Sequence, residues 1–238
     1  MTKVAIVAAL EREVRPLVKT WRVVEREHGG RRFKFFDDGA GAVVVCGGIG
    51  EQAARRAAEA VIALYRPEIV QSVGFAGALV PSLTVGDIFS PARVIDGKDG
   101  SSANIENGTG ILLSFSSVAG TGQKSKLVDA WGAQAIDMEA AAVAKSARSH
   151  GVRFEVTKVI SDEFDFEMPA MDRFIRSDGQ FQSAKFLAFV AIRPWLWAKV
   201  IRLGRKSTKA AKALCRALER QQSIQSAKTP ELDPTVGV

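Results

Sequence analysis

Short apolar runs of strand length recur through the first two thirds of the sequence. Several are continuous rather than alternating, which is typical of central strands covered on both faces. Helical patterns lie between them, over residues 51–65, which stop before Pro67, and over residues 138–150, which stop before Gly151. The predicted strands are residues 4–9, 43–46, 69–73, 85–89, 133–136 and 156–160.

The alternation of strands and helices predicts an α/β fold with three layers, in which a mixed, mainly parallel central sheet has helices on both faces. In such folds the ligand site lies beyond the carboxyl ends of the strands. Residues 10–13, 74–77 and 161–162 each follow a predicted strand. We therefore expect these segments to be loops that converge on one site.

The remaining segments have a different composition. Residues 97–125 are rich in Gly, Ser and Asn and predict a hairpin or a short strand flanked by mobile loops. Residues 185–220 mix apolar side chains with cations at helical spacing, which predicts one or two amphipathic helices bent near Pro194. From about residue 221 to residue 238 the chain is polar, and we expect no structure of its own there.

We therefore divide the chain into a main domain, residues 1–184, and a basic amphipathic helical tail with a polar end, residues 185–238. Arg193, Pro194, Lys199 and Arg202 interrupt the apolar run of the tail, so it is not expected to span a membrane.

The net charge of +7 belongs to the tail. Residues 1–188 carry 23 Lys/Arg and 23 Asp/Glu, whereas residues 189–238 carry 10 and 3. The main domain is therefore not expected to bind nucleic acid.

Cysteine and histidine are scarce and scattered. Cys46 and Cys215 are far apart, and His28 and His150 each stand alone. This pattern predicts a reducing compartment, no disulfide framework and no metal cluster. The N-terminus becomes acidic too soon for a signal peptide, so we expect a cytoplasmic protein.

Three acidic residues stand where the site is expected, namely Glu13, Glu139 and Asp162. Each has a structural alternative when it is taken alone. Glu13 could be a solvated residue of a first helical turn, Asp162 could be a helix N-cap, and the neighbouring Met138 could fill the core. Glu139 is harder to explain in this way, because it precedes an Ala/Val-rich stretch with no obvious cation nearby.

Five segments in order carry a family resemblance: AALEREV, GGIG, VGFAGAL followed by VGDI, AIDMEAAAVA and KVISDEFD. Together they resemble the motifs of the purine nucleosidase/phosphorylase superfamily, and most closely its 5′-methylthioadenosine/S-adenosylhomocysteine nucleosidase branch. The resemblance covers roughly residues 3–166. Each motif alone is weak, but the order and the spacing make the combination specific.

The resemblance implies cleavage of the N-glycosidic bond of a purine nucleoside. Positive charge develops on the sugar and negative charge on the base, so the reaction needs a proton donor at the base and a base for the attacking water. Glu13 matches the acid that activates the water. Asp162 matches the acid that donates to N7 of adenine, and Ser161 would orient it.

The same resemblance implies a set of substrate-binding residues. Met138 and Glu139 match the pair that packs on the ribose and hydrogen-bonds to it. Ala76 and Gly77 match a backbone turn that passes close to sugar and base, where only a small residue allows such an approach. Phe75 stands where the branch usually has a small polar residue, which puts the exact substrate in doubt.

Water is favoured over phosphate as the nucleophile. A phosphate beside the anomeric carbon needs cations, but Glu11 and Glu13 follow the first strand, and no arginine precedes Gly74 in residues 71–73. Arg12 and Arg15 are the nearby cations that keep a phosphorolytic purine nucleoside phosphorylase open. A nucleoside-binding or membrane-adaptor protein without catalysis is a further alternative.

Three departures suggest a bulky 5′ group: Phe75, Lys158 where the branch often has arginine, and a shorter chain between Phe75 and Glu139. With Trp195 and Trp197 on the basic tail, the sequence is similar to hopanoid-associated members that act on adenosylhopane. Such a helix suits an anionic membrane interface. The alternative is that the tail packs on the domain or on a partner subunit.

The resemblance further implies a small-molecule purine nucleoside as partner, no cofactor and a homodimer. We expect the protein in the cytoplasm, with peripheral contact at the inner membrane face if the tail binds lipid.

Overall fold

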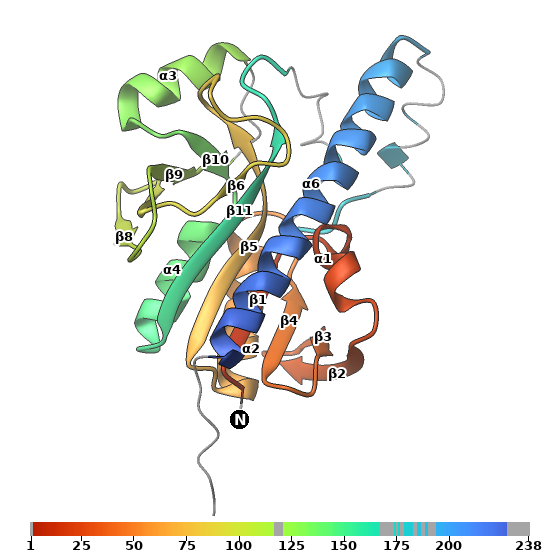
Figure 1. The fold of residues 1–238 in the computed structure, drawn as a ribbon, viewed down its shortest axis with the longest axis vertical. Coiled ribbons are helices and arrows are strands. Elements are labelled where there is room, and N and C mark those ends of the chain that lie inside the picture. Colours follow the sequence, from red (N-terminus) through yellow and green to blue (C-terminus); the bar gives the residue numbers. More distant parts are fainter. Residues whose placement is uncertain are drawn as a thin grey trace, which may run out of the picture.

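The computed structural model describes residues 2–116, 121–166 and 194–227, together with residues 174, 176, 179–182, 185, 186 and 189. Figure 1 shows the course of the chain. The strands are β1 (Val4–Ala8), β2 (Arg22–His28), β3 (Arg31–Asp37), β4 (Ala42–Cys46), β5 (Ile69–Ala78), β6 (Ile88–Phe89), β7 (Arg93–Asp96), β8 (Ser102–Asn104), β9 (Ile111–Ser114), β10 (Ala135–Asp137) and β11 (Arg153–Asp162). The helices are α1 (Glu11–Val18), α2 (Glu51–Tyr65), α3 (Thr121–Trp131), α4 (Ala140–Ser149) and α6 (Pro194–Ala227).

The strands form one mixed sheet with β1 and β5 at its centre. β1 pairs in parallel with β4 and with β5, and β5 pairs in parallel with β11. Antiparallel pairs lie further out, for example β2 with β3 and β7 with β8. The main path runs β2-β3-β4-β1-β5-β10-β9-β7-β8, and β11 pairs with β5 and β6. The predicted α/β class with a mixed sheet is confirmed.

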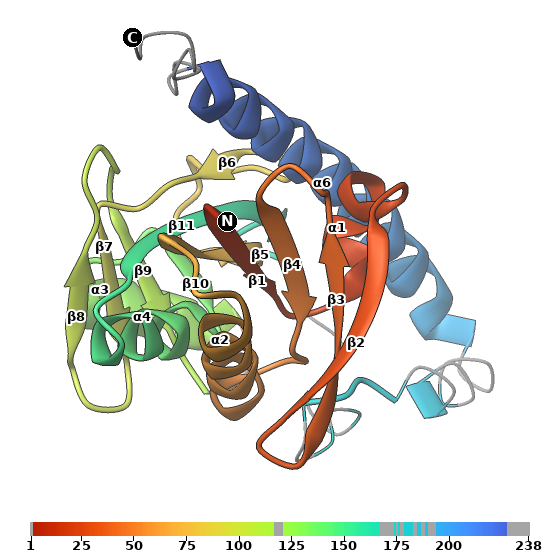
Figure 2. The ribbon, with the colours of Figure 1, turned by 90° about the horizontal axis from the view of Figure 1, so that it is seen from below.

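Helices cover both faces of the sheet, with α2 and α4 on one side and α1 and α6 on the other (Figure 2). Successive residues of β1 alternate between the two cores. Ala5 and Val7 pack with α2 and α4, whereas Val4 and Ile6 belong to the core that α1 and α6 complete. This burial on both faces is the physical reason for the continuous apolar runs in the sequence.

Helix α6 is a single helix of 34 residues that begins at Pro194. Proline suits the first turn because its missing N–H would have no partner there. Ala210, Leu214 and Leu218 recur every four residues on the buried face of α6 and join the core beside α1. This half of the tail therefore packs on the domain, which was one of the two alternatives for it.

Several predicted boundaries are wrong. Residues 74–77 and 161–162, expected as loops, are strand residues near the ends of β5 and β11. The predicted strand 85–89 is reduced to Ile88–Phe89. Residues 221–227, expected to lack structure, continue α6. The segment 97–125 holds β8, β9 and the start of α3, and this helix was not predicted.

The division at residue 184 stays a prediction. The residues just before the predicted bend at Pro194, and residues 228–238, lie outside the described residues. Among the helices that the structure describes, none combines the length and the apolar character needed to cross a membrane.

Candidate functional site

The candidate residues gather where the C-terminal parts of β5 and β11 run side by side. In this parallel pair Lys158 lies opposite Gly74, and Asp162 lies opposite Gly77 after a shift in register. The neighbouring strand β1 ends at Ala8 and leads directly into α1. The carboxyl ends of three strands distant in sequence therefore meet at one edge of the sheet, as expected for a ligand site in this fold class.

Asp162 is buried, with 5% of its surface exposed. The Ser161 hydroxyl donates a hydrogen bond to its Oδ1 at 2.9 Å, and the Lys124 ammonium donates to its Oδ2 at 3.0 Å. On β5 a Cβ placed on Gly77 would lie only 2.9 Å from Oδ2. Glycine is therefore needed at position 77 for the carboxylate to occupy this place.

Glu13 lies in the first turn of α1 and is buried, with 4% exposed. Its Oε2 accepts hydrogen bonds from the backbone N–H groups of Ala9 and Leu10 at 3.2 and 3.1 Å. A Cβ on Gly74 would lie 3.0 Å from the same oxygen, so the carboxylate rests against β5. Burial raises the pKa of Glu13, and the Leu10 hydrogen bond and the charge of Lys158 offset this only in part.

Glu139 immediately precedes α4 and is partly exposed at the site. Its Oε1 accepts a hydrogen bond at 2.8 Å from the backbone N–H of Gly50, the last residue of the GGIG segment. The protein around the carboxyl group, followed by the neighbouring Asp137 carboxylate, raises the pKa of Glu139 to about 7. This carboxyl group therefore carries a proton for part of the time at neutral pH.

A buried ion pair lies among these carboxylates. The Lys158 ammonium contacts Asp137 Oδ2 at 2.8 Å and donates to the Ser72 hydroxyl at 3.2 Å. Burial alone would lower the pKa of Lys158, but the Asp137 and Glu139 carboxylates outweigh burial and hold it above its usual value. Lys158 also interacts electrostatically with Glu13. It is thus the cation around which the acidic side of the site is arranged.

Phe75, Ala76 and Ser161 lie along the same strands. Phe75 is half-buried against the core on the α1 side, and its backbone forms a hydrogen bond with the Glu13 carboxylate. Ala76 is buried, and its carbonyl lies 3.4 Å from the Ser161 hydroxyl. The backbone of β5 therefore connects the Glu13 end of the site with the Asp162 end.

Met138 is partly exposed and lines a cavity of about 250 Å³ together with Ser114, Phe115 and Ala141. Ser114 also donates a hydrogen bond at 2.5 Å to Asp137, and its hydroxyl accepts one from the Ala141 N–H at 2.9 Å. The start of α4 is thus held against β9. This anchoring fixes the position of the adjacent Met138.

The structure brings the predicted site residues into this region and adds four to which sequence reasoning gave no place in the site. Lys158 was noted only as a departure from the pattern of the branch. Asp137 stands next to Met138 within the AIDMEAAAVA segment, so its place in the motif could have indicated it. Gly50 ends the GGIG segment, which was noted without a role. Lys124 had no comparable signal, because it lies in a Gly/Ser-rich stretch whose helix the sequence pattern does not predict.

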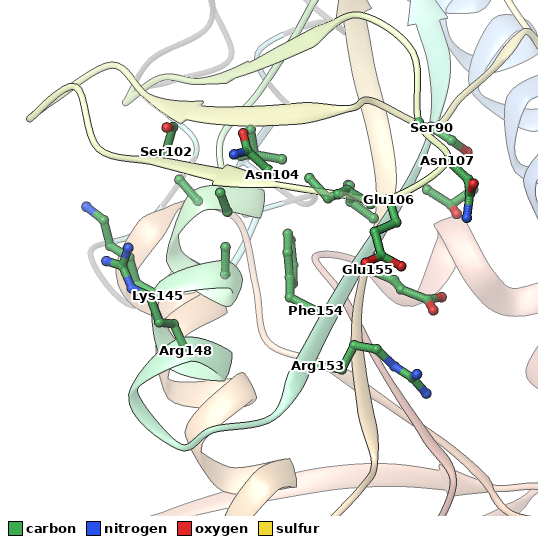
Figure 3. A pocket seen from close by; sticks show the side chains of 18 of the residues that line it. Ser90, Ser102, Asn104, Glu106, Asn107, Lys145, Arg148, Arg153, Phe154 and Glu155 are labelled. Carbon is green, nitrogen blue, oxygen red and sulfur yellow. The ribbon is translucent and has the colours of Figure 1, made fainter.

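A larger cavity, of about 890 Å³, lies away from these carboxylates. Figure 3 shows it between β8, with Ser102 and Asn104, and the side chains of Arg148 on α4 and Phe154 on β11. The cavity reaches the amino-terminal half of β11, whereas Asp162 is the last residue at the carboxyl end of that strand. The chemistry-bearing residues and this cavity are therefore separate features of the described part of the chain.

Comparison with known proteins agrees with this fold and this arrangement of segments. The sequence profile of the phosphorylase superfamily matches residues 3–116 and 109–190. The fold is similar to that of the 5′-methylthioadenosine nucleosidase of Arabidopsis thaliana, with a TM-score of 0.72 and 18% identity, covering 96% of this chain and 98% of that chain.

Two structures from Helicobacter pylori are also similar. The 5′-methylthioadenosine/S-adenosylhomocysteine nucleosidase has a TM-score of 0.69 and 17% identity, covering 94% of this chain and 98% of that one. The futalosine hydrolase has a TM-score of 0.65 and 18% identity, covering 92% and 98%. At these identities the likeness establishes a shared fold.

Proposed function

The chain belongs to the phosphorylase superfamily, and we propose that it is a purine nucleosidase that hydrolyses the N-glycosidic bond of a 5′-substituted adenosine and releases adenine. The observation that carries this proposal is the placement of two buried carboxyl groups along β5. Glu13 rests against Gly74, and Asp162 rests against Gly77. A base for water and an acid for the purine would thus flank one bound nucleoside.

The proposed mechanism assigns one task to each group. As the bond between the sugar and N9 breaks, Asp162 delivers a proton to N7, so that the purine leaves as a neutral molecule. Glu13 accepts a proton from the water that adds to the anomeric carbon. Glu139 holds the ribose hydroxyls, and Ser161 keeps Asp162 oriented through its 2.9 Å hydrogen bond.

Charge supports water over phosphate as the nucleophile. Both buried lysines that the structure describes in the site are already paired, Lys158 with Asp137 at 2.8 Å and Lys124 with Asp162 at 3.0 Å. Glu13 and Glu139 also interact electrostatically with Lys158. A phosphate dianion would meet these carboxylates with little free positive charge. Arg12 and Arg15, which kept the phosphorylase alternative open, are both exposed, and the Arg12 guanidinium lies 6.0 Å from the ring centre of Phe181.

A panel of substrates tests which adenosine the chain cleaves. We expect the wild-type chain to release adenine from methylthioadenosine, S-adenosylhomocysteine or a lipid-linked adenosylhopane-like substrate, and chromatography of a substrate panel identifies which.

The Asp162→Asn variant tests the proposed acid. It should lower kcat/KM by roughly 30- to 1,000-fold, the equivalent of about 2–4 kcal/mol. The matched control is Asp165→Asn, since Asp165 is exposed. Unchanged adenine release by Asp162→Asn would remove this residue from the mechanism.

We also propose that the first half of α6 contacts an anionic membrane surface, which would suit a lipid-linked 5′ group. Trp197 and Ile201 are 49% and 56% exposed one helical turn apart. Residues 194–210, this first half, contain five Lys/Arg and no Asp/Glu. Aromatic, aliphatic and cationic side chains in this combination favour the interface of anionic lipids. Trp195, which was part of the same prediction, has a side chain outside the described ones.

Vesicle co-sedimentation tests this contact on the full-length chain. Removing the tail is unsuitable, because Leu214 and Leu218 of α6 are part of the core. We expect binding to vesicles that contain phosphatidylserine, and its loss in the double variant Trp197→Ser/Ile201→Ser. Equal, negligible binding by both proteins would contradict the membrane proposal.

We also propose that the protein is a homodimer. Light scattering in solution measures its molecular mass and so tests this proposal.

A further inference from the structure

Lys124 forms a buried ion pair with the proposed acid. Its side chain is 2% exposed, and the ammonium donates hydrogen bonds to Asp162 Oδ2 at 3.0 Å and to the Glu163 backbone carbonyl at 2.9 Å. Lys124 comes from α3, which is distant in sequence from β11. Burying an ammonium group costs free energy unless a partner compensates its charge. We therefore ask what the buried Lys124 ammonium does for Asp162.

The pair creates a difficulty for a simple acid. Asp162 must carry a proton in order to give one to the purine, but its Oδ2 already accepts a hydrogen bond from the buried Lys124 ammonium. The Lys124 nitrogen is thus a proton donor that lies one hydrogen bond away from the carboxyl oxygen that needs a proton. Ser161 holds the other carboxylate oxygen, so Oδ2 is the oxygen through which Lys124 acts.

We propose that Lys124 is a positioning residue that stores the leaving-group proton and supplies it through Asp162. This inference rests on the proposed nucleosidase function. When the bond between the anomeric carbon and N9 breaks, its electron pair goes to the purine. N7 takes a proton from Asp162, and Asp162 takes one from the Lys124 ammonium, which becomes a neutral amine. The water that adds to the sugar gives its proton to Glu13, and solvent returns that proton to Lys124.

The surroundings of the pair leave few competing charges in the described part of the chain. From β5 it faces Gly77, which has no side chain to titrate. At the end of β11 the Glu163 carboxylate is paired with Lys206 of α6. On α3 itself Lys126 and Asp129 are exposed to solvent. The proton transfer therefore depends on Lys124 and Asp162 rather than on a wider network.

The pH dependence of kcat tests the inference, because an ammonium group keeps its proton to higher pH than a carboxylic acid does. In Lys124→Gln the carboxyl group is the remaining proton source. We expect its kcat to fall by about tenfold or more, and the alkaline limb of its profile to move to lower pH by about one unit or more. Lys124→Arg should fold with the ion pair retained and keep the alkaline limb at or above the wild-type position. Lys126→Gln, on the exposed side of the same helix, should match the wild type.

A double-mutant cycle supplies the second measurement. If Lys124 acts through Asp162, Lys124→Gln should cause no further loss of kcat in an Asp162→Asn background. A lower kcat with an unchanged pH profile, or fully additive losses in the double variant, would overturn the inference while adenine release by the wild type upholds the proposed function. A wild-type chain that releases no base from any nucleoside would overturn the proposed function, and this inference with it.

Discussion

Glu13 is a buried carboxyl group in the first turn of a helix, and its burial determines how it should respond to pH. The raised pKa places its loss of a proton above the ordinary value of 4.5. Backbone N–H groups of Ala9 and Leu10 still point at its Oε2, which keeps the ionised form accessible. A buried carboxyl group with a raised pKa and an accessible ionised form has the properties expected of a general base.

The expected result is an acid limb in the profile of kcat/KM. Only ionised Glu13 can accept the proton of water, so kcat/KM should fall as pH decreases through the raised pKa, at a pH above 4.5. Glu13→Gln should remove this limb and lower the rate by roughly 100- to 10,000-fold. Glu11→Gln, an exposed acid in the same turn, is the control. An identical acid limb in Glu13→Gln would assign the limb to another group.

Glu139 allows a prediction about stability. Its pKa of about 7 in the folded protein lies above the ordinary value of 4.5, so folding favours the protonated form. This contribution to stability is complete below about pH 4.5 and is lost as pH rises through about 7. Glu139→Gln imitates the neutral form. Its Tm relative to the wild type should therefore increase between pH 4.5 and pH 8 in calorimetric scans. A Tm difference that is constant over this range would contradict the assignment.

At the residue scale, sequence alone indicated the candidate acids but not their partners. Glu13, Glu139 and Asp162 fall in motifs. The structure places Glu13 and Asp162 against β5, and Glu139 interacts electrostatically with Glu13 and Lys158. Lys124 escaped notice, since an ion pair over 38 positions of sequence depends on tertiary packing rather than on a local pattern. The roles of these residues stay predictions until the variants are measured.

Among the elements, β5 and β11 differ most instructively from expectation. The glycines in residues 74–77 suggested a turn, yet β5 continues to Ala78 and β11 continues to Asp162. The glycines of β5 make room for neighbouring side chains instead of turning the chain. Gly74 and Gly77 lack the Cβ atoms that would collide with Glu13 and Asp162. Sequence patterns do not distinguish a glycine that turns the chain from one that admits a neighbouring side chain.

Gly77→Ala tests this explanation of β5. The added methyl group would lie 2.9 Å from Asp162 Oδ2 and displace the carboxylate from its place. We expect about tenfold or greater loss of kcat, with the far-ultraviolet circular dichroism of a folded protein. Gly122→Ala is the control, because nothing lies within 4 Å of its added Cβ. Wild-type activity in Gly77→Ala would show that the close approach is unimportant.

Helix α6 was predicted as an amphipathic helix, but its burial could not be read from its composition. Leu214 is fully buried beside α1 and the central strands. Leu214→Ala should therefore lower the free energy of unfolding by about 2–5 kcal/mol, as expected for a large-to-small change in a core. Lys212→Ala, at an exposed position of the same helix, should change it by less than about 0.5 kcal/mol. Equal effects in denaturant titrations would contradict the packing of α6.

Over the whole molecule, the layered α/β architecture was predictable because both faces of the central strands are buried. The β2–β3 hairpin was not, since β2 is largely exposed and polar, and the phenylalanines of β3 are interrupted by Lys34 and form no apolar run of strand length. The charge distribution also has a structural meaning. The excess of cations falls mainly on α6, whose other face completes the core. The same helix thus stabilises the fold and presents the basic surface.

Hydrolysis of the glycosidic bond is the central proposal, and isotope labelling tests it most directly. The chain is incubated with its best adenosine substrate in water enriched in oxygen-18, in the presence of phosphate, and the sugar product is analysed by mass spectrometry. We expect free adenine and a free sugar that carries the heavy oxygen at the anomeric carbon. A sugar 1-phosphate, or no release of adenine from any substrate, would contradict the proposal.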